Sequence, residues 1–280
     1  MTFPLKILAT AAGQVQFTPY GAQVLSYVPT GQREVLWQNT PELLAAAYAA
    51  GKPLRAGIPL CWPWFMAHPT DPAAPSHGFA RIKPWELVAQ QQTPERAQAT
   101  LVLTADGQHR AFPFQARAEV TITLTDFLHV ALTTANLSDR AMPLTQALHT
   151  YVQVGALAHT TLVGLEGLPR VHITPNQPVP PQAEPLRIQG ETELRYSNVA
   201  GPVVVQDQRW QRCIEVVNQG CSEVVVWNPG PEKALKLDIP LGGEAHFVCV
   251  EAATIQPPLQ LPPGGEFTLS TALRVRPSAA

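Results

Sequence analysis

The sequence predicts an all-β protein, a large antiparallel β-sandwich with one or two short helices. Three observations lead to this prediction: many short segments rich in β-branched and aromatic residues, little helical periodicity, and a high proline content. Proline accounts for 29 of 280 residues, about twice the usual ~5%, and proline is excluded from helix interiors. No internal repeat or shift in composition divides the sequence, so we expect a single domain over residues 1–280.

The first predicted elements are two short strands and a helix. Residues 15–28 alternate loosely and carry a Pro-Tyr-Gly turn signal at 19–21. One helix follows, because residues 43–50 are good helix formers, Thr40 can cap their N-terminus and Gly51 ends the pattern.

A long irregular segment comes next, and strands fill most of the remaining chain. Residues 54–80 are rich in Pro, Trp and Gly, and the run His-Pro-Thr-Asp-Pro-Ala-Ala-Pro at 68–75 excludes regular structure. A loop of this length is either functional or disordered, and its aromatic residues favour an ordered loop. Residues 169–190 form a second Pro-rich stretch, which we assign to a surface loop. The predicted strands are 99–103, 116–124, 128–136, 145–154, 160–164, 203–205, 214–218, 223–227, 245–251 and 267–275.

Charge and composition exclude several classes of protein. The 19 Lys and Arg residues balance 21 Asp and Glu residues, for a net charge of -2, and this lack of a basic excess argues against nucleic-acid binding. The N-terminus has no secretion signal, and no apolar run approaches the ~20 residues that span a bilayer, so we expect a soluble, cytoplasmic protein without membrane partners. The four cysteines, at 61, 213, 221 and 249, lack CxxC spacing and predict buried, reduced thiols rather than disulfides.

Common catalytic signatures are absent. The sequence has no GxGxxG or GxxxxGK[ST] motif, no GxSxG, no HExxH and no zinc-type spacing of Cys and His. These absences weaken hydride transfer, P-loop phosphoryl transfer, serine hydrolysis and metalloprotease chemistry as functions.

Two ionisable residues occupy unusual positions on predicted strands. Alternation places Glu251 on one face with Phe247 and Cys249, where poor hydration raises a carboxyl pKa toward the value that suits a general base. His149 shares a face with Tyr151 and a glutamine, a combination suited to sugar hydroxyls and to proton exchange near neutral pH. The alternatives are a water-exposed Glu at a strand end and a hydrogen-bonded sheet histidine.

Arg55 and Arg81 flank the long irregular segment, and His77 lies just before Arg81. Both arginines adjoin small residues, which allow backbone to approach a ligand closely. A pair of guanidinium groups can hold a phosphate or carboxylate through bidentate bonds. The alternative is that each arginine braces a loop.

Five blocks of sequence resemble one family when taken together. They are, in chain order, Arg55-Ala-Gly-Ile-Pro-Leu-Cys-Trp-Pro-Trp-Phe65, His77-Gly-Phe-Ala-Arg81 followed by Pro84-Trp85-Glu86, Leu148-His149-Thr150-Tyr151, Val226-Trp-Asn-Pro-Gly-Pro231, and Val248-Cys-Val-Glu251. They resemble the glucose-6-phosphate 1-epimerase branch of the aldose 1-epimerase (mutarotase) family, and they cover most of the chain.

The resemblance implies a galactose-mutarotase-like β-supersandwich that binds a sugar on its concave face and needs no metal or organic cofactor. It implies an isomerase that interconverts the α and β anomers of glucose 6-phosphate and similar aldohexose 6-phosphates. His149 matches the histidine that protonates the ring oxygen, and Glu251 matches the carboxylate that takes the anomeric hydroxyl proton. His77 matches a histidine that holds the ring oxygen or nearby hydroxyls, while Arg55 and Arg81 match the arginines on the phosphate side.

The sequence also departs from the family pattern in the expected sugar site. Glu193 stands where the family has a sugar-binding Asp, and Ser76 stands where relatives often have Gln or Ala. Ile82 replaces a common Asn, and Ala56 replaces a Gly. These changes leave the preferred sugar open.

Two other functions remain open at this point. The same pocket would suit a non-catalytic sugar-phosphate-binding protein, or a mutarotase for unphosphorylated aldoses whose arginines only brace loops. Asp238 and Asn228 lie in apolar surroundings near the last motif. The alternatives for them are a place in the pocket lining and packing or turn roles, and we favour packing or turn roles. We expect a monomer.

Overall fold

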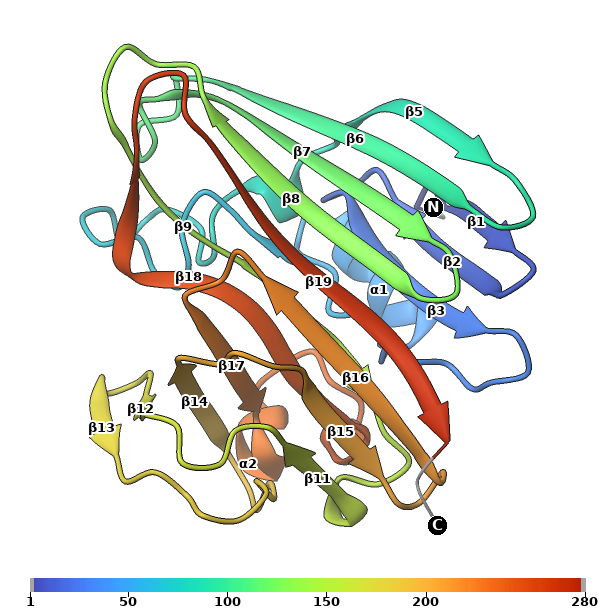
Figure 1. Cartoon of the computed structure of the whole chain (residues 1–280). Helices are drawn as coiled ribbons and strands as arrows, with labels where there is room; N and C mark the ends of the chain where they lie inside the picture. The colour runs from blue at the N-terminus through green and yellow to red at the C-terminus, as the bar shows by residue number, and fades with distance from the viewer. Residues whose placement is uncertain (1–2, 278–280) are drawn as a thin grey trace.

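Three antiparallel sheets contain the strands of the part of the chain that the structure describes (Figure 1). The structure is a computed structural model and describes residues 3–277. One sheet has three strands, β1 (Lys6–Thr10), β2 (Gly13–Thr18) and β3 (Gln23–Pro29), and the other two have eight strands each. The predicted all-β architecture of antiparallel sheets is therefore confirmed.

The sheet that carries the candidate site is called the front sheet here. Its strands are hydrogen-bonded in the order β13–β12–β14–β17–β18–β9–β4, and β10 also pairs with β18. The bounds are β4 (Leu60–Cys61), β9 (Met142–Leu148), β10 (Tyr151–Gln153), β12 (Arg170–His172), β13 (Gln177–Val179), β14 (Thr192–Ser197), β17 (Glu223–Asn228) and β18 (Phe247–Leu261).

The back sheet has the order β11–β15–β16–β19–β8–β7–β6–β5. The bounds are β5 (Glu86–Gln92), β6 (Ala97–Asp106), β7 (Gln115–Leu124), β8 (Leu128–Asn136), β11 (Thr160–Val163), β15 (Val203–Asp207), β16 (Arg212–Gln219) and β19 (Glu266–Pro277). In Figure 1 the last strand, β19, runs through the middle of this sheet and leads back from the long strand β18.

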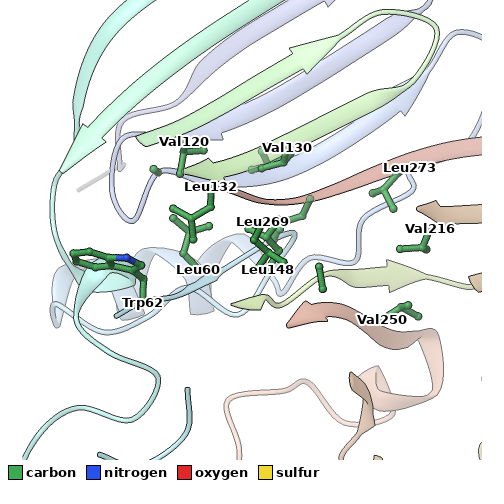
Figure 2. Close-up of a cluster of buried hydrophobic side chains, with 14 of the residues drawn as sticks. Leu60, Trp62, Val120, Val130, Leu132, Leu148, Val216, Val250, Leu269 and Leu273 are labelled. Atoms are coloured by element: carbon green, nitrogen blue, oxygen red, sulfur yellow. The ribbon is translucent and has the colours of Figure 1, made fainter. Parts of the chain in front are cut away.

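The inner faces of the front and back sheets pack on one another. Burial alternates along β7, where Ala116, Ala118, Val120 and Ile122 are buried, as expected for strands with one face in the core. Figure 2 shows side chains that meet in this core: Leu60, Leu148 and Val250 from the front sheet, Val120, Val130, Leu132, Val216, Leu269 and Leu273 from the back sheet, and Trp62 just after β4.

The same cluster of buried side chains extends from Leu8 to Leu273. We therefore propose that the chain folds as one domain, as expected for residues 1–280. Residues 1–2 and 278–280 of that prediction lie outside the described residues.

Two α-helices are present in the described chain, in agreement with the prediction of one or two. Helix α1 (Pro41–Ala49) begins as predicted, because the Thr40 hydroxyl accepts a hydrogen bond from the Leu43 amide at 3.3 Å and Gly51 follows with φ of 63°. The other is the short α2 (Gly230–Ala234), and three 3₁₀ turns complete the helical elements: η1 (Ala80–Ile82), η2 (Leu157–His159) and η3 (Gly243–His246).

The predicted strand 145–154 is interrupted at His149 and Thr150. The His149 amide leaves the ladder and donates to the Pro59 carbonyl at 3.0 Å, while the Thr150 amide donates to the Leu148 carbonyl. The chain therefore passes from β9 to β10 through a break, and His149 stands at that break rather than within a continuous strand.

Several strands were not predicted. β5 is almost entirely exposed, and β12 and β13 have only three residues each, so none of them carries a clear apolar pattern. The segment 169–190 is thus not only a surface loop, because it contains two short strands, of which β13 forms the edge of the front sheet and β12 pairs with both β13 and β14. β1 and β14 were missed as well, whereas the segment 54–80 is irregular and ordered as predicted, apart from β4.

Two further predictions were buried, reduced cysteines and no membrane-spanning segment. All four cysteines are free thiols, of which Cys61 and Cys249 are buried as predicted and Cys213 and Cys221 are only partly buried. Within residues 3–277, neither helix has the length and apolar character to cross a membrane.

Candidate active site

A cavity of about 890 Å³ opens on the front sheet, between its exposed face, α1 and α2. Strands β14, β17 and β18 supply its floor through Glu193, Val225, Trp227 and Glu251, and α1 supplies an apolar wall. All of the residues that the sequence analysis selected as site residues line this one cavity: Arg55, Ser76, His77, Arg81, His149, Glu193 and Glu251.

His149 and Glu251 meet on the floor of the cavity. The His149 Nε2 atom lies 3.4 Å from Glu251 Oε1, and the Glu251 side chain is only 1% exposed. Glu251 is therefore buried within β18, as its apolar neighbours predicted, and does not face water at a strand end. The imidazole of His149 stacks on the Tyr151 ring at 4.9 Å between centroids, and Trp227 closes another side at 5.7 Å.

Burial drives both members of this pair toward their neutral forms. It raises the pKa of Glu251 well above its ordinary value, with the nearby Glu193 adding to the increase and Arg81 opposing it. Burial also lowers the pKa of His149 to about 3, with the positive charges of Arg81 and Arg55 adding to the decrease. Burial therefore favours a neutral carboxyl group on Glu251 next to a neutral imidazole on His149.

Each member of the pair keeps one polar atom free for a ligand. Among the described residues, Glu251 Oε2 and His149 Nδ1 are buried and have no hydrogen-bond partner. Buried polar atoms are rarely left without a partner, because the cost is about 1–3 kcal/mol each. A ligand with several hydroxyl groups would satisfy them.

His77 approaches the pair from the opposite wall, with its ring 6.0 Å from that of His149. Its Nδ1 atom accepts a hydrogen bond from the Met66 amide at 3.2 Å and lies 3.3 Å from Cys61 Sγ. Burial, followed by the charge of Arg81, lowers the pKa of His77 well below its ordinary value, so the ring is neutral. Because Nδ1 is an acceptor, the single ring proton is on Nε2, which makes His77 a hydrogen-bond donor at that atom.

The backbone around His77 is held in an unusual conformation. His77 and Met66 both have φ of 62°, and the His77 amide donates to the Met66 carbonyl at 2.7 Å. At Gly78, which has φ of 74°, an added Cβ atom would lie 1.9 Å from the Trp62 carbonyl oxygen. The glycine of the His-Gly-Phe-Ala-Arg block is therefore required by a close approach of two backbone segments, and non-glycine residues with positive φ cluster at functional sites.

The two arginines have different surroundings. The Arg55 Nε atom donates to Asp238 Oδ1 at 2.8 Å, and its Nη1 atom donates to the Tyr151 hydroxyl at 3.1 Å. Arg81 donates through Nη2 to the Ser76 carbonyl at 2.8 Å, while its buried Nε atom has no partner among residues 3–277. Ser76 thus contacts Arg81 through its backbone.

Asp238 is the residue whose role differs from the prediction. It lines the cavity and pairs with Arg55, instead of serving only packing or a turn. Its position could not be recognised from spacing, since 183 residues separate it from Arg55. Asn228 does serve a turn as predicted, because its side chain donates to the Glu244 and Phe247 carbonyls and accepts from the Gly230 amide.

Three lysines at the rim were also not selected from the sequence. Lys52, Lys233 and Lys236 line the same cavity, and Lys233 pairs with Glu191 at 2.7 Å. Together with the two arginines they place five cationic side chains around the cavity, an arrangement that favours an anionic ligand. Lys233 lies in α2 and Lys236 follows that helix, whereas Lys52 lies just after α1, and no motif in the sequence marks them.

The comparisons with known proteins agree on one family. The family model described as aldose 1-epimerase matches residues 5–274. A protein of Escherichia coli (strain K12) named "Putative glucose-6-phosphate 1-epimerase" is 32% identical over 252 residues, which cover 86% of this chain and 79% of that protein. One of the same name from Salmonella typhimurium is 33% identical over 261 residues, covering 88% and 82%. A crystal structure of a "putative mutarotase" from Salmonella typhimurium has a TM-score of 0.87 and 28% identity and covers 98% of this chain and 90% of that chain.

Proposed function

The chain belongs to the aldose 1-epimerase family, and we propose that it is a hexose-6-phosphate mutarotase that interconverts the α and β anomers of glucose 6-phosphate and similar aldohexose 6-phosphates. The observation that carries the proposal is the buried His149–Glu251 pair on the floor of a cavity that is rimmed by cationic side chains. The first feature supports proton transfer on a sugar, and the second supports a phosphorylated sugar. The names of the relatives support the same substrate class.

Mutarotation requires two proton transfers and no net change in the protein. A base removes the proton from the hydroxyl on C1 while an acid gives a proton to the ring oxygen, which breaks the bond between C1 and the ring oxygen and yields the open aldehyde. After rotation about the C1–C2 bond, the reverse transfers close the ring on the other face. In this proposal Glu251 is the base and His149 is the acid.

The one proton that Glu251 and His149 exchange is sufficient for this cycle. The neutral pair becomes a carboxylate and an imidazolium when the proton moves from Glu251 to His149, whose atoms are 3.4 Å apart, and the proton count stays the same. Hydrogen bonds from the sugar to the free Glu251 oxygen would favour the ionised arrangement. A positioned acid or base typically contributes ~10²–10⁴-fold in rate.

The other selected residues would bind the sugar. The Nε2–H group of His77 is suited to donate to the ring oxygen or a nearby hydroxyl, since its Nδ1 atom is already engaged. Glu193 opposes Trp227 across β14 and β17 and can accept from hydroxyl groups. Arg81, with its free Nε atom, and Arg55 would hold the phosphate, and Ser76 would hold Arg81 in place.

One observation favours a second candidate, a mutarotase of unphosphorylated aldoses. Arg55 is already paired with Asp238, which reduces the positive charge that it can offer to a phosphate. In this alternative the two arginines position loops, and the sugar has no anionic group.

Two-dimensional NMR exchange spectroscopy separates these functions. We expect faster exchange between the anomers of glucose 6-phosphate than of glucose, and Arg81→Ala should raise KM for the phosphorylated sugar most. Arg96→Ala, at an exposed turn of the back sheet, is the matched control. Equal rates for both sugars, unaffected by Arg81→Ala, would reject the phosphate clamp and leave the unphosphorylated aldose as substrate.

The expected monomer, the cytoplasmic location and the independence from metal and organic cofactors stay predictions. Size-exclusion chromatography with light scattering checks whether the protein is a monomer. If the protein needs no metal, it should keep full activity after treatment with a chelator.

A further inference from the structure

The thiol of Cys249 has no part in the proposed reaction, although it lies against both reacting side chains. Cys249 is two residues before Glu251 on β18, so both side chains lie on the same face of the strand, and it pairs with Tyr151 on the neighbouring β10. Its sulfur, one nitrogen of His149 and one oxygen of Glu251 all lie within 4.8 Å of one another. A thiol, an imidazole and a carboxyl group that converge in this way are the ligand types that bind zinc.

The spacing and burial of these atoms are compatible with a bound metal ion. The 3.4 Å between His149 Nε2 and Glu251 Oε1 is close to the edge of a tetrahedron whose ligands lie about 2.0–2.1 Å from zinc, which is about 3.3 Å. Glu251 is 1% exposed and Cys249 is fully buried. The second oxygen of Glu251 has no partner among the described residues, so the carboxylate can turn toward an ion without breaking a hydrogen bond.

We propose that His149, Cys249 and Glu251 form an inhibitory site for a thiophilic divalent cation, with Zn²⁺ as the best-fitting ion. Three protein ligands and one water molecule would give a four-coordinate site. A bound ion occupies Nε2 of His149 and the carboxylate of Glu251, so it excludes the sugar from both. The inhibition rests on the proposed function, whereas the binding site does not.

The mixed set of sulfur, nitrogen and oxygen ligands selects among cations. Mg²⁺ and Ca²⁺ prefer oxygen ligands only, and the thiolate favours Zn²⁺ or Co²⁺ over them. Arg55 and Arg81 line the same cavity, and their positive charges weaken the binding of any cation. The site therefore holds a reversible inhibitor rather than a resident cofactor.

The absorption spectrum of bound Co²⁺ tests the metal site without an assay of enzyme activity. Co²⁺ added to the protein should produce the intense ultraviolet band of a thiolate–cobalt bond together with tetrahedral visible bands, and Zn²⁺ should remove both. Cys249→Ala should abolish the ultraviolet band, while Cys213→Ala, on β16 of the back sheet, should retain it. Cys249→Ser, which keeps the volume of the side chain, serves as a second variant if the alanine variant unfolds.

Inhibition by ZnCl₂ in the anomer-exchange assay tests the consequence. The wild type and Cys213→Ala should lose activity reversibly, with recovery on addition of EDTA, and more substrate should raise the zinc concentration required. Cys249→Ala should keep its activity without zinc and need at least ~10-fold more zinc for the same inhibition. Mg²⁺ should have no effect on any variant.

Each part of the proposal has a result that overturns it. A cobalt band that survives in Cys249→Ala, or no thiolate band in the wild type, rejects the site. Equal zinc sensitivity of Cys249→Ala and the wild type rejects the inhibition through this site. If the protein fails to exchange anomers at all, the proposed function fails, and the cobalt spectra alone still decide whether the site exists.

Discussion

Replacement of Glu251 by glutamine separates a catalyst from a sugar-binding protein that uses the same cavity. Glutamine has nearly the same size and hydrogen-bonding reach, so the floor of the cavity keeps its shape, but the amide cannot carry a proton between the sugar and His149. The rate of anomer exchange should fall by ~10²–10⁴-fold, the usual contribution of a positioned base. This loss corresponds to an increase of about 3–5 kcal/mol in the activation free energy.

The fold should tolerate this change. Burial raises the pKa of Glu251 in the folded protein well above the ~4.3 of an unfolded chain. The wild type is therefore relatively stable below pH ~4.3 and loses stability as pH rises toward the folded pKa, because ionisation becomes easier in the unfolded chain. Glutamine has no such titration, so the Tm of Glu251→Gln near neutral pH should equal or exceed that of the wild type.

The assay is NMR exchange on glucose 6-phosphate, with thermal unfolding followed by circular dichroism and sugar binding followed by calorimetry. Glu266→Gln, an exposed carboxylate at the start of β19, is the matched control and should match the wild type. An unchanged exchange rate in Glu251→Gln would refute the assignment of Glu251 as the base. Binding without exchange in the wild type would identify a non-catalytic sugar-phosphate-binding protein.

Three other predictions concern pH and stability. Because burial lowers the pKa of His149 to about 3, kcat/KM should show no histidine titration near pH 6.5, where an ordinary histidine acid would lose activity as pH rises. Rates measured well below KM, corrected for ionisation of the substrate's phosphate, decide it. Gly78→Ala should yield little folded protein, because the Cβ atom of alanine would lie 1.9 Å from the Trp62 carbonyl oxygen. Expression level and circular dichroism measure this effect, and a normal Tm would contradict the argument. Arg195→Ala should lower the free energy of unfolding by about 3–5 kcal/mol in a urea titration. The guanidinium of Arg195 lies 2.7 Å from the buried carboxylate of Glu223, which would lose its ion-pair partner. A loss under ~1 kcal/mol would show that the pair is not buried as described.

His149 and Glu251, the proposed acid and base, show how far a sequence can predict a site. The apolar neighbours of Glu251 predicted a buried carboxyl group on one face of a strand, and the structure has that arrangement in β18. The same alternation treated His149 as part of a continuous strand, whereas the chain breaks there to bond with the Pro59 carbonyl. That bond joins residues 90 positions apart, and such contacts are not recorded in local periodicity.

The surroundings of the site depend still more on distant contacts. The pairing of Asp238 with Arg55 and the hydrogen bond from the Met66 amide to His77 are set by the packing of separate loops. The missed strands have a related cause, since short or exposed strands such as β12 and β5 carry no apolar alternation from which to predict them. The residues selected from the sequence line one cavity, and the structure adds hydrogen bonds, such as that from the Met66 amide to His77, that orient them.

The low charge of this chain bears on how the site can operate. Charged residues make up only 14% of the sequence, yet a single cavity contains five cationic side chains and the acidic Glu193, Asp238 and Glu251. Burial, and then the positive charges of Arg81 and Arg55, lower the pKa of His149 and so oppose its protonation. A phosphate dianion bound by these arginines would offset their charge and ease formation of the imidazolium that the reaction requires. Phosphate binding would then promote proton transfer as well as hold the sugar, so we expect inorganic phosphate, added with unphosphorylated glucose, to raise kcat in the wild type and not in Arg81→Ala.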